Sequence, residues 1–167
     1  MYRRIIPVVI SILFLAACNS KPGEKDTQKD STDTDHGHAH APVTGGVVPP
    51  LPAIPEGAKV FFRNLNDGAV LASPLKIEMG ADGIRVDTAG PVIAGIGHHH
   101  LLINAGDSVP AGRMIPNDSA HIHFGRGQTE TEVTLAPGTY RLALQMADGL
   151  HRSYGSALST AISITVK

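Results

Sequence analysis

Nine histidines occur among the 167 residues, and eight of them lie in three short groups. The groups are HGHAH at residues 36–40, HHH at residues 98–100 and HIH at residues 121–123, while His151 stands apart. Imidazole is a good ligand for Cu(II) and Zn(II), whereas iron–sulfur clusters need several thiolates. The chain has a single cysteine. The residue types therefore predict binding of copper or zinc by histidine.

The HIHF segment assigns its two histidines to one side of a strand. Residues two apart on a β-strand share a face. If Ile122 and Phe124 point into the core, His121 and His123 share the opposite face. The segment therefore presents a pair of imidazoles away from the apolar interior.

The HHHLLIN segment divides its histidines between two faces. When Leu101 and Ile103 point into the core, His99 points inward with them, and His98 and His100 point outward. For His99 we favour the interpretation of a core histidine whose nitrogens are hydrogen-bonded. The segment then offers a second His-x-His pair outside the core.

The segment after HIHF predicts two carboxylates beside the imidazoles. A two-residue turn at residues 126–127 would pair His123 with Glu130 and His121 with Glu132. A three-residue turn would reverse this parity, and the shorter turn is favoured because it keeps the following aliphatic residues on the core face. Glu130 and Glu132 are therefore expected to orient the imidazoles by hydrogen bonds from outside the ligand shell.

Two strands with paired histidines can build one copper or zinc site, because the sheet fixes the geometry of the ligands. The predicted ligands are His98, His100, His121 and His123, with His151 completing the set from a loop. The competing interpretation is a hydrogen-bonded polar patch that binds no ion.

The methionines offer a second type of metal ligand. Met79 and Met146 alternate with core residues and are expected to pack in the interior. Met114 falls in a loop, so packing and metal ligation are both open for it.

The elements that carry these residues are predicted to be strands. Residues 57–167 contain short runs with period-two alternation, such as TYRLALQMA at residues 139–147 and AISITVK at residues 161–167, separated by Gly, Pro, Asn and Asp. Eight or nine such runs predict an all-β fold, an immunoglobulin-like antiparallel β-sandwich. LAPGTYRLAL is typical of the corner between two sandwich strands, with Tyr140 entering the second one.

The first 17 residues are predicted to be a lipoprotein signal peptide. Two arginines precede an apolar run, and the run ends in Leu-Ala-Ala before Cys18. This ending resembles the bacterial lipobox, in which the cysteine thiol receives lipid such as palmitate. Cys18 is therefore expected to anchor the protein in the membrane of the cell envelope, and Asn19 favours the outer membrane, facing the periplasm.

Residues 18–56 are predicted to be a flexible linker, because they are polar first and rich in Pro and Gly later. The linker contains His36, His38 and His40, which give two equally open interpretations. One is weak capture of a metal ion, weakened by the entropy of ordering the chain. The other is a solvated polar linker without a ligand.

Charge and motifs exclude several other functions. The net charge is −1 and no long Lys/Arg block is present, which disfavours nucleic-acid binding. A G-x-S-x-G nucleophile motif is absent, and GRG lacks the Lys of a phosphate loop. HIHFGRG approaches the first copper motif of copper–zinc superoxide dismutases but has Arg126 where Gly or Pro is expected. We therefore expect a protein that is not an enzyme.

Four segments together resemble a bacterial family, domain of unknown function 4399: GHHHLLIN, HIHFGRGQTETEVTLAPG, DGLH and ISITV. The resemblance covers most of residues 58–167 and implies a secreted or lipid-anchored domain, without an established activity. Asn104 stands where family members often have Asp, and RSYGSA follows His151 where they often have a second His with prolines. The matching positions include Gly97, His98, His99, His100, His121, His123, Gly125, Glu130, Asp148 and His151.

Two functions follow from these observations. The first is a lipid-anchored envelope protein whose domain carries or buffers copper or zinc. The second is a non-catalytic module for interaction or adhesion at the envelope, in which the histidines are structural. Metal affinity that depends on single histidines distinguishes the two.

Overall fold

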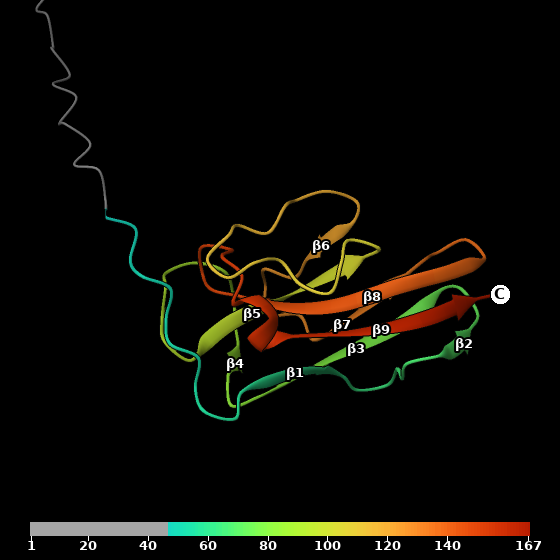
Figure 1. Ribbon diagram of the computed structural model, residues 1–167, viewed down its shortest axis with the longest axis horizontal. Coiled ribbons are helices and arrows are strands. Elements are labelled where there is room, and N and C mark those ends of the chain that lie inside the picture. Colours follow the sequence, from blue (N-terminus) through green and yellow to red (C-terminus); the bar gives the residue numbers. More distant parts are fainter. Residues whose placement is uncertain (1–46) are drawn as a thin grey trace, which may run out of the picture. The chain divides into compact units, whose positions relative to one another are not determined.

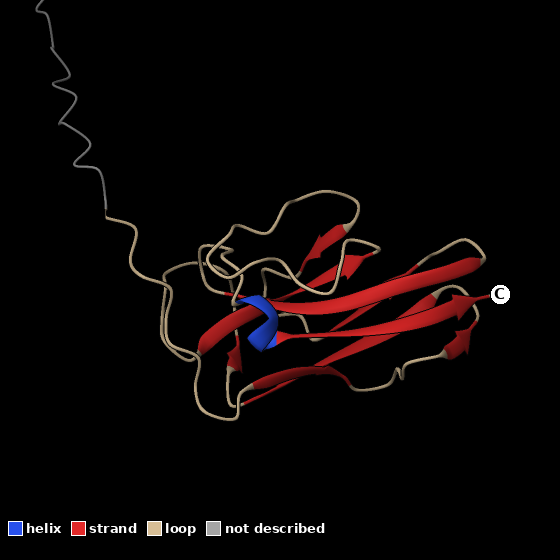
Figure 2. Ribbon diagram, viewed as in Figure 1, coloured by secondary structure: helices blue, strands red, loops and turns tan. Residues whose placement is uncertain are grey.

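The computed structural model describes residues 47–167. The predicted signal peptide, the lipidation site Cys18 and the linker histidines His36, His38 and His40 lie outside the described residues. The described part contains strands and one 3₁₀ helix, η1 (Gly155–Leu158), as Figures 1 and 2 show. No helix within it is both long and apolar enough to cross a membrane. The prediction of an all-β fold is confirmed.

The strands occur where alternating residues were found in the sequence. They are β1 (Lys59–Phe62), β2 (Ala69–Leu71), β3 (Leu75–Asp82), β4 (Arg85–Val86), β5 (Ile96–Ile103), β6 (His121–His123), β7 (Glu130–Val133), β8 (Gly138–Ala147) and β9 (Ser159–Val166). One sheet has the order β1-β3-β7, and the other has the order β2-β9-β8-β5-β4, with β6 paired to β5.

The long strands pair antiparallel, as predicted. β5, β8 and β9 form the centre of the larger sheet, with His99 opposite Met146 and Leu142 opposite Ile162. Two short strands differ from the prediction, because β2 pairs parallel with β9 and β4 pairs parallel with β5. Both lie at the ends of the sheet order, where two or three residues suffice to cover an edge.

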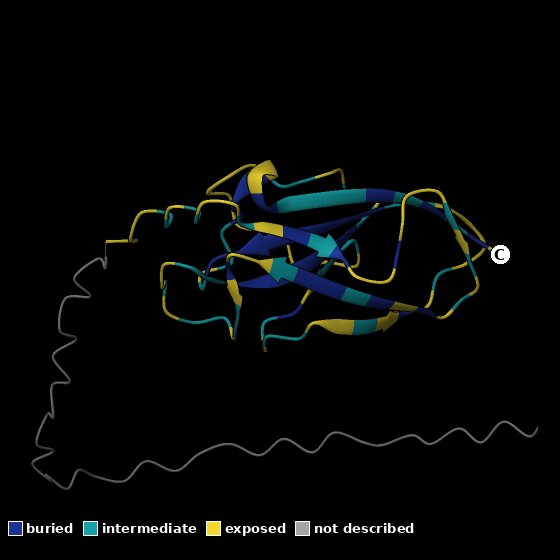
Figure 3. Ribbon diagram, turned by 90° about the horizontal axis from the view of Figure 1, so that it is seen from below, coloured by how far each residue is buried: buried dark blue, intermediate teal, exposed yellow. Residues whose placement is uncertain are grey.

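The core lies between the two sheets. Alternate residues of β3, among them Ile77 and Met79, pack in one cluster with Leu144 and Met146 of β8 and with Ile164 of β9. Figure 3 shows buried segments in strands of both layers. This face-to-face packing is typical of a β-sandwich and follows from the alternation in the sequence.

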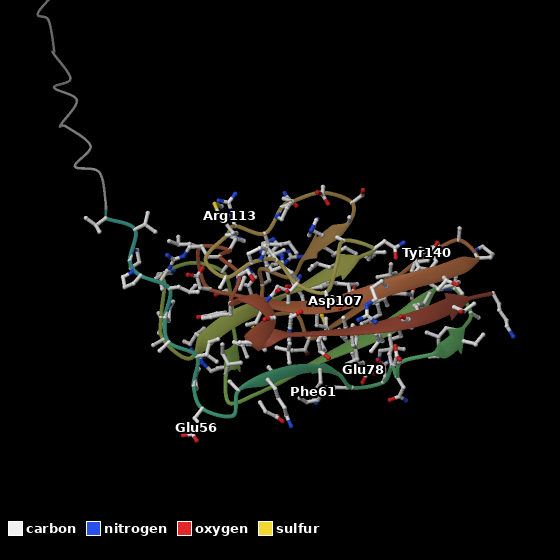
Figure 4. The ribbon with its side chains drawn as sticks, viewed as in Figure 1. Glu56, Phe61, Glu78, Asp107, Arg113 and Tyr140 are labelled. Carbon is white, nitrogen blue, oxygen red and sulfur yellow. The ribbon has the colours of Figure 1, made fainter. Side chains whose placement is uncertain are left out.

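The predicted corner before β8 is present. The Tyr140 hydroxyl donates a hydrogen bond to the carbonyl of Ala136 at 3.0 Å, four residues upstream. Figure 4 shows Tyr140 at one end of β8. The bond fixes the entry of the chain into the longest strand, as in the tyrosine corner of immunoglobulin-like domains.

The outer face of the larger sheet is covered by loops. Gln145 of β8 is fully buried, and its side chain accepts a hydrogen bond from the amide of Val109 at 3.1 Å. The same side chain donates to the carbonyls of Gly155 and Leu158 at 3.0 and 3.1 Å. Figure 1 shows the loop between β5 and β6 above β8. This cover buries polar residues on the face of the sheet that points away from the core.

Candidate metal centre

Two adjacent strands bring three histidines together. His98 and His100 lie two apart on β5, and their Nε2 atoms are 3.1 Å apart. His123 of β6 lies directly opposite His100 in the antiparallel register. One ring nitrogen from each of the three residues lies within 4.8 Å of the others. The two strands were predicted to bring His-x-His pairs together, and for these three residues they do.

His151 adds a fourth ring from the loop after β8. Its ring centroid lies 5.0 Å from that of His98 and 4.7 Å from that of His123, and 6.2 Å from that of His100. The rings of His98 and His123 are themselves 5.0 Å apart. We call the four residues His98, His100, His123 and His151 the histidine cluster.

A buried ion pair holds the loop that carries His151. The Asp148 carboxylate is fully buried and accepts hydrogen bonds from Nε and Nη2 of Arg152 at 2.8 and 2.6 Å, and from the amides of Leu150 and Arg152. Arg152 also donates to the carbonyl of Pro49. His151 itself has a φ of 65°, in the left-handed region. The surroundings of the loop therefore fix a backbone conformation that histidine seldom adopts.

Three residues of the cluster, His98, His100 and His123, hold their imidazoles in the neutral form. Burial, reinforced by the neighbouring histidines, lowers the pKa of His98 to about 4 and that of His100 to about 2. Burial and the nearby His151 also lower the pKa of His123. A metal ion binds the unprotonated nitrogen. These three imidazoles are therefore ready for ligation at pH values at which an exposed histidine carries a proton.

A cavity of about 230 Å³ lies against the cluster. Three of the histidines, His100, His123 and His151, line it together with residues 114–117. His98 and His100 have almost no exposed surface, with 0% and 1% of the residue accessible. An ion would therefore reach the cluster from this cavity, past the segment 114–117.

His121 does not lie with the predicted ligands. It shares a strand with His123, but it is opposite Leu102 in the register, not opposite a histidine. Its Nδ1 lies 2.8 Å from a carboxylate oxygen of Asp118, in the turn before β6. The histidine cluster therefore contains four of the five predicted ligands, His151 among them, and lacks His121.

The predicted pairing of the carboxylates with the imidazoles is wrong. β7 pairs with β3 in the smaller sheet, where Glu130 is opposite Glu78 and Glu132 is opposite Lys76. The turn around residues 126–127 leads the chain from one sheet to the other, because burial of Val133 against Leu75 sets the register there. Glu130 and Glu132 are exposed, and Glu130 forms an ion pair with Lys76 at 3.3 Å.

His99 lies on the core side of β5, as predicted, but its nitrogens are not hydrogen-bonded. Neither ring nitrogen has a partner among the described residues, although the residue is fully buried. Burial, followed by the charge of Arg63, lowers the pKa of His99 to about 4. His99 is therefore a neutral imidazole in an apolar environment and does not belong to the cluster.

The roles of two residues near the histidines were not found from the sequence. Asp118 holds the ring of His121, outside the cluster. Gly125 leaves the space that the ring of His123 occupies, since a Cβ at this position would overlap the imidazole. The spacing H-x-G could have indicated the second role, because a residue two positions away lies on the same side of an extended chain.

Comparison with known proteins gives one match. The model of the family described as Domain of unknown function (DUF4399) matches residues 77–167, which include all four residues of the histidine cluster. No curated protein and no solved structure matches the chain. The family model therefore covers the segment that carries the site, together with β4 to β9.

Proposed function

The chain belongs to the DUF4399 family, and from the geometry of its histidines we propose that the domain binds one Cu(II) or Zn(II) ion. The ligands in this proposal are His98, His100 and His123, with His151 as the fourth. The domain would carry or buffer the ion rather than use it in catalysis. The observation that supports this most strongly is the approach of three ring nitrogens to within 4.8 Å of one another.

Buried ring nitrogens without a hydrogen-bond partner favour a metal site over a polar patch of structural histidines. A patch of structural histidines satisfies buried ring nitrogens with hydrogen bonds, because an unpartnered buried polar atom is costly. In the cluster, the only ring-to-ring hydrogen bond joins the Nε2 atoms of His98 and His100, and the Nδ1 atoms of both residues have no partner among the described residues. An ion between the converging nitrogens would replace this single hydrogen bond by ligand bonds from several rings.

The choice of ion follows from the donors. Four imidazoles without a thiolate suit Cu(II) and Zn(II), and intrinsic affinity favours copper. The charge of Asp148 acts on His98. The Asp148 carboxylate accepts hydrogen bonds from the side chain of Arg152 and from two backbone amides. This carboxylate is not free to act as a general base, which supports binding and release over catalysis.

We place the protein in the cell envelope, anchored by lipid on Cys18 and without nucleic acid as a partner, as an expectation from its N-terminal residues and charge. The outer membrane, facing the periplasm, fits Asn19 after the cysteine. In this location the linker histidines His36, His38 and His40 would add a weaker capture site before the domain.

Calorimetric titration with Cu(II) and Zn(II) tests the proposal. The full chain carries the substitutions His36→Ala, His38→Ala and His40→Ala, so that any binding reports on the domain. We expect one site of micromolar or tighter affinity. His123→Ala should weaken it at least about 100-fold, because one ligand is lost from a closed set.

His121→Ala is the matched control for His123→Ala. The two residues lie on the same strand and differ by whether the ring joins the cluster. We expect the affinity of His121→Ala to stay within about threefold of the parent, since only the contact with Asp118 is lost. Absence of binding in the parent chain, or equal losses in both variants, would favour the interaction module with structural histidines.

A further inference from the structure

We infer that Met114 is an additional ligand of the site and that its thioether binds copper in the Cu(I) state. The inference rests on the proposed function, since it extends the same histidine cluster. It adds a soft sulfur donor to a set of nitrogen donors and thereby distinguishes copper from zinc.

Met114 lies at the entrance of the cluster. It lines the cavity together with His100, His123 and His151. Its exposure is 69%, whereas Met79 and Met146 are fully buried in the core. An exposed methionine gains nothing from packing, and among the methionines of the described residues Met114 is the one that the core does not explain.

The backbone around Met114 is fixed to the loop of His151. Met114 forms an antiparallel bridge with Arg152. The amide of Ile115 donates to the carbonyl of His151 at 3.0 Å, and the amide of Ser153 donates to the carbonyl of Arg113 at 2.9 Å. Figure 4 shows Arg113 at the surface, in the loop between β5 and β6. The exposed side chain of Met114 is therefore attached to an ordered backbone next to a cluster residue.

The chemistry of sulfur gives this position its selectivity. Thioether sulfur is a soft ligand that favours Cu(I), while imidazole serves Cu(II), Zn(II) and Cu(I) alike. The unbranched side chain of methionine has three rotatable bonds, so it can turn toward the cavity when an ion is present. With Met114 the site would bind both Cu(I) and Cu(II), whereas the sulfur would add little to the affinity for Zn(II).

The test compares Cu(I) and Zn(II) on the same variants of the full chain, with the three linker histidines replaced by alanine. Cu(I) affinity is measured without oxygen by competition with a colorimetric Cu(I) chelator, and Zn(II) affinity by titration. Met114→Leu, which keeps the apolar volume, should weaken Cu(I) about tenfold or more and leave Zn(II) within about twofold. Met114→Cys should restore Cu(I) binding. X-ray absorption of the Cu(I) form should show a sulfur neighbour that Met114→Leu removes.

Three other results would overturn the inference, and each of them has a different consequence for the proposed function. Equal Cu(I) affinity of the parent and Met114→Leu, without a sulfur neighbour, would remove Met114 from the site and leave the proposed function intact. Equal losses for Cu(I) and Zn(II) would assign Met114 to the structure of the loop. If the parent chain binds neither ion, both the proposed function and the role of Met114 as a ligand are wrong.

Discussion

The two faces of β5 carry the same residue type in different surroundings. His99 points into the core between the sheets, and His98 and His100 point to the space under the loops. All three are almost completely buried, and the pKa of each is far below its ordinary value. Burial and a low pKa therefore do not mark a metal site here. What differs is whether other imidazoles lie close enough to share an ion.

The two faces are also buried by different means. The inner face is covered by apolar side chains of the opposite sheet, which were visible as alternation in the sequence. The outer face is covered by polar loops that Gln145 holds with three hydrogen bonds. Hydrogen bonds between loops are less evident from sequence than period-two alternation, and this explains why the outer histidines were predicted to point away from the core but the loops that cover them were not predicted.

Acid should destabilise the metal-free domain strongly, through both faces of β5. The folded state keeps His98, His99 and His100 neutral down to a pKa of about 4 or lower, whereas the unfolded chain protonates them near 6.5. Since the unfolded state binds more protons between these values, stability is full above pH 6.5 and falls as the pH drops toward 4. Three histidines give a slope of roughly 4 kcal/mol per pH unit.

Denaturant unfolding at a series of pH values, with a chelator present, measures this slope. Replacement of His99 by leucine should reduce it by about a third, because one of three titrating groups is lost. A slope that stays the same in this variant would mean that the outer face alone carries the acid sensitivity. A flat profile in the parent would contradict the neutral state of all three residues.

A methyl group at Gly125 should damage the outer face without touching the inner one. In Gly125→Ala the new Cβ would overlap the ring of His123, so the ring must turn away from the cluster. We expect metal affinity to fall about tenfold to 100-fold, while the unfolding free energy in the metal-free state changes by less than about 1 kcal/mol. Titration and denaturant unfolding of the same preparation check both values. Unchanged affinity would show that His123 is not held at this position.

The sequence predicted the strands and most of their faces but not every partner. Alternation placed Ile122 and Phe124 toward the core and the histidines of β6 on the other side, and this is confirmed. The partner of β7 was missed, because a hairpin and a crossing to the other sheet fit the same alternation. His151 was predicted only as a residue that could complete the set, since the conformation of its loop depends on the ion pair of Asp148 with Arg152, which the sequence pattern does not reveal.

Replacement of His99 by leucine should have the smallest effect and should sharpen the contrast between the faces. Both ring nitrogens of His99 are buried without a partner, and such groups cost on the order of 1 kcal/mol or more each. Leucine has a similar volume and no polar atom, so we expect the metal-free domain at neutral pH to gain about 1 kcal/mol.

The outer face provides the control for this variant. His99→Leu should leave metal affinity within about twofold, whereas His98→Leu, one position away, should abolish it by removing a ligand. Thermal unfolding and titration separate the two effects. If His99→Leu lost metal affinity at unchanged stability, the inner histidine would act on the ion through β5. Burial among apolar side chains would then no longer distinguish a core histidine from a metal ligand.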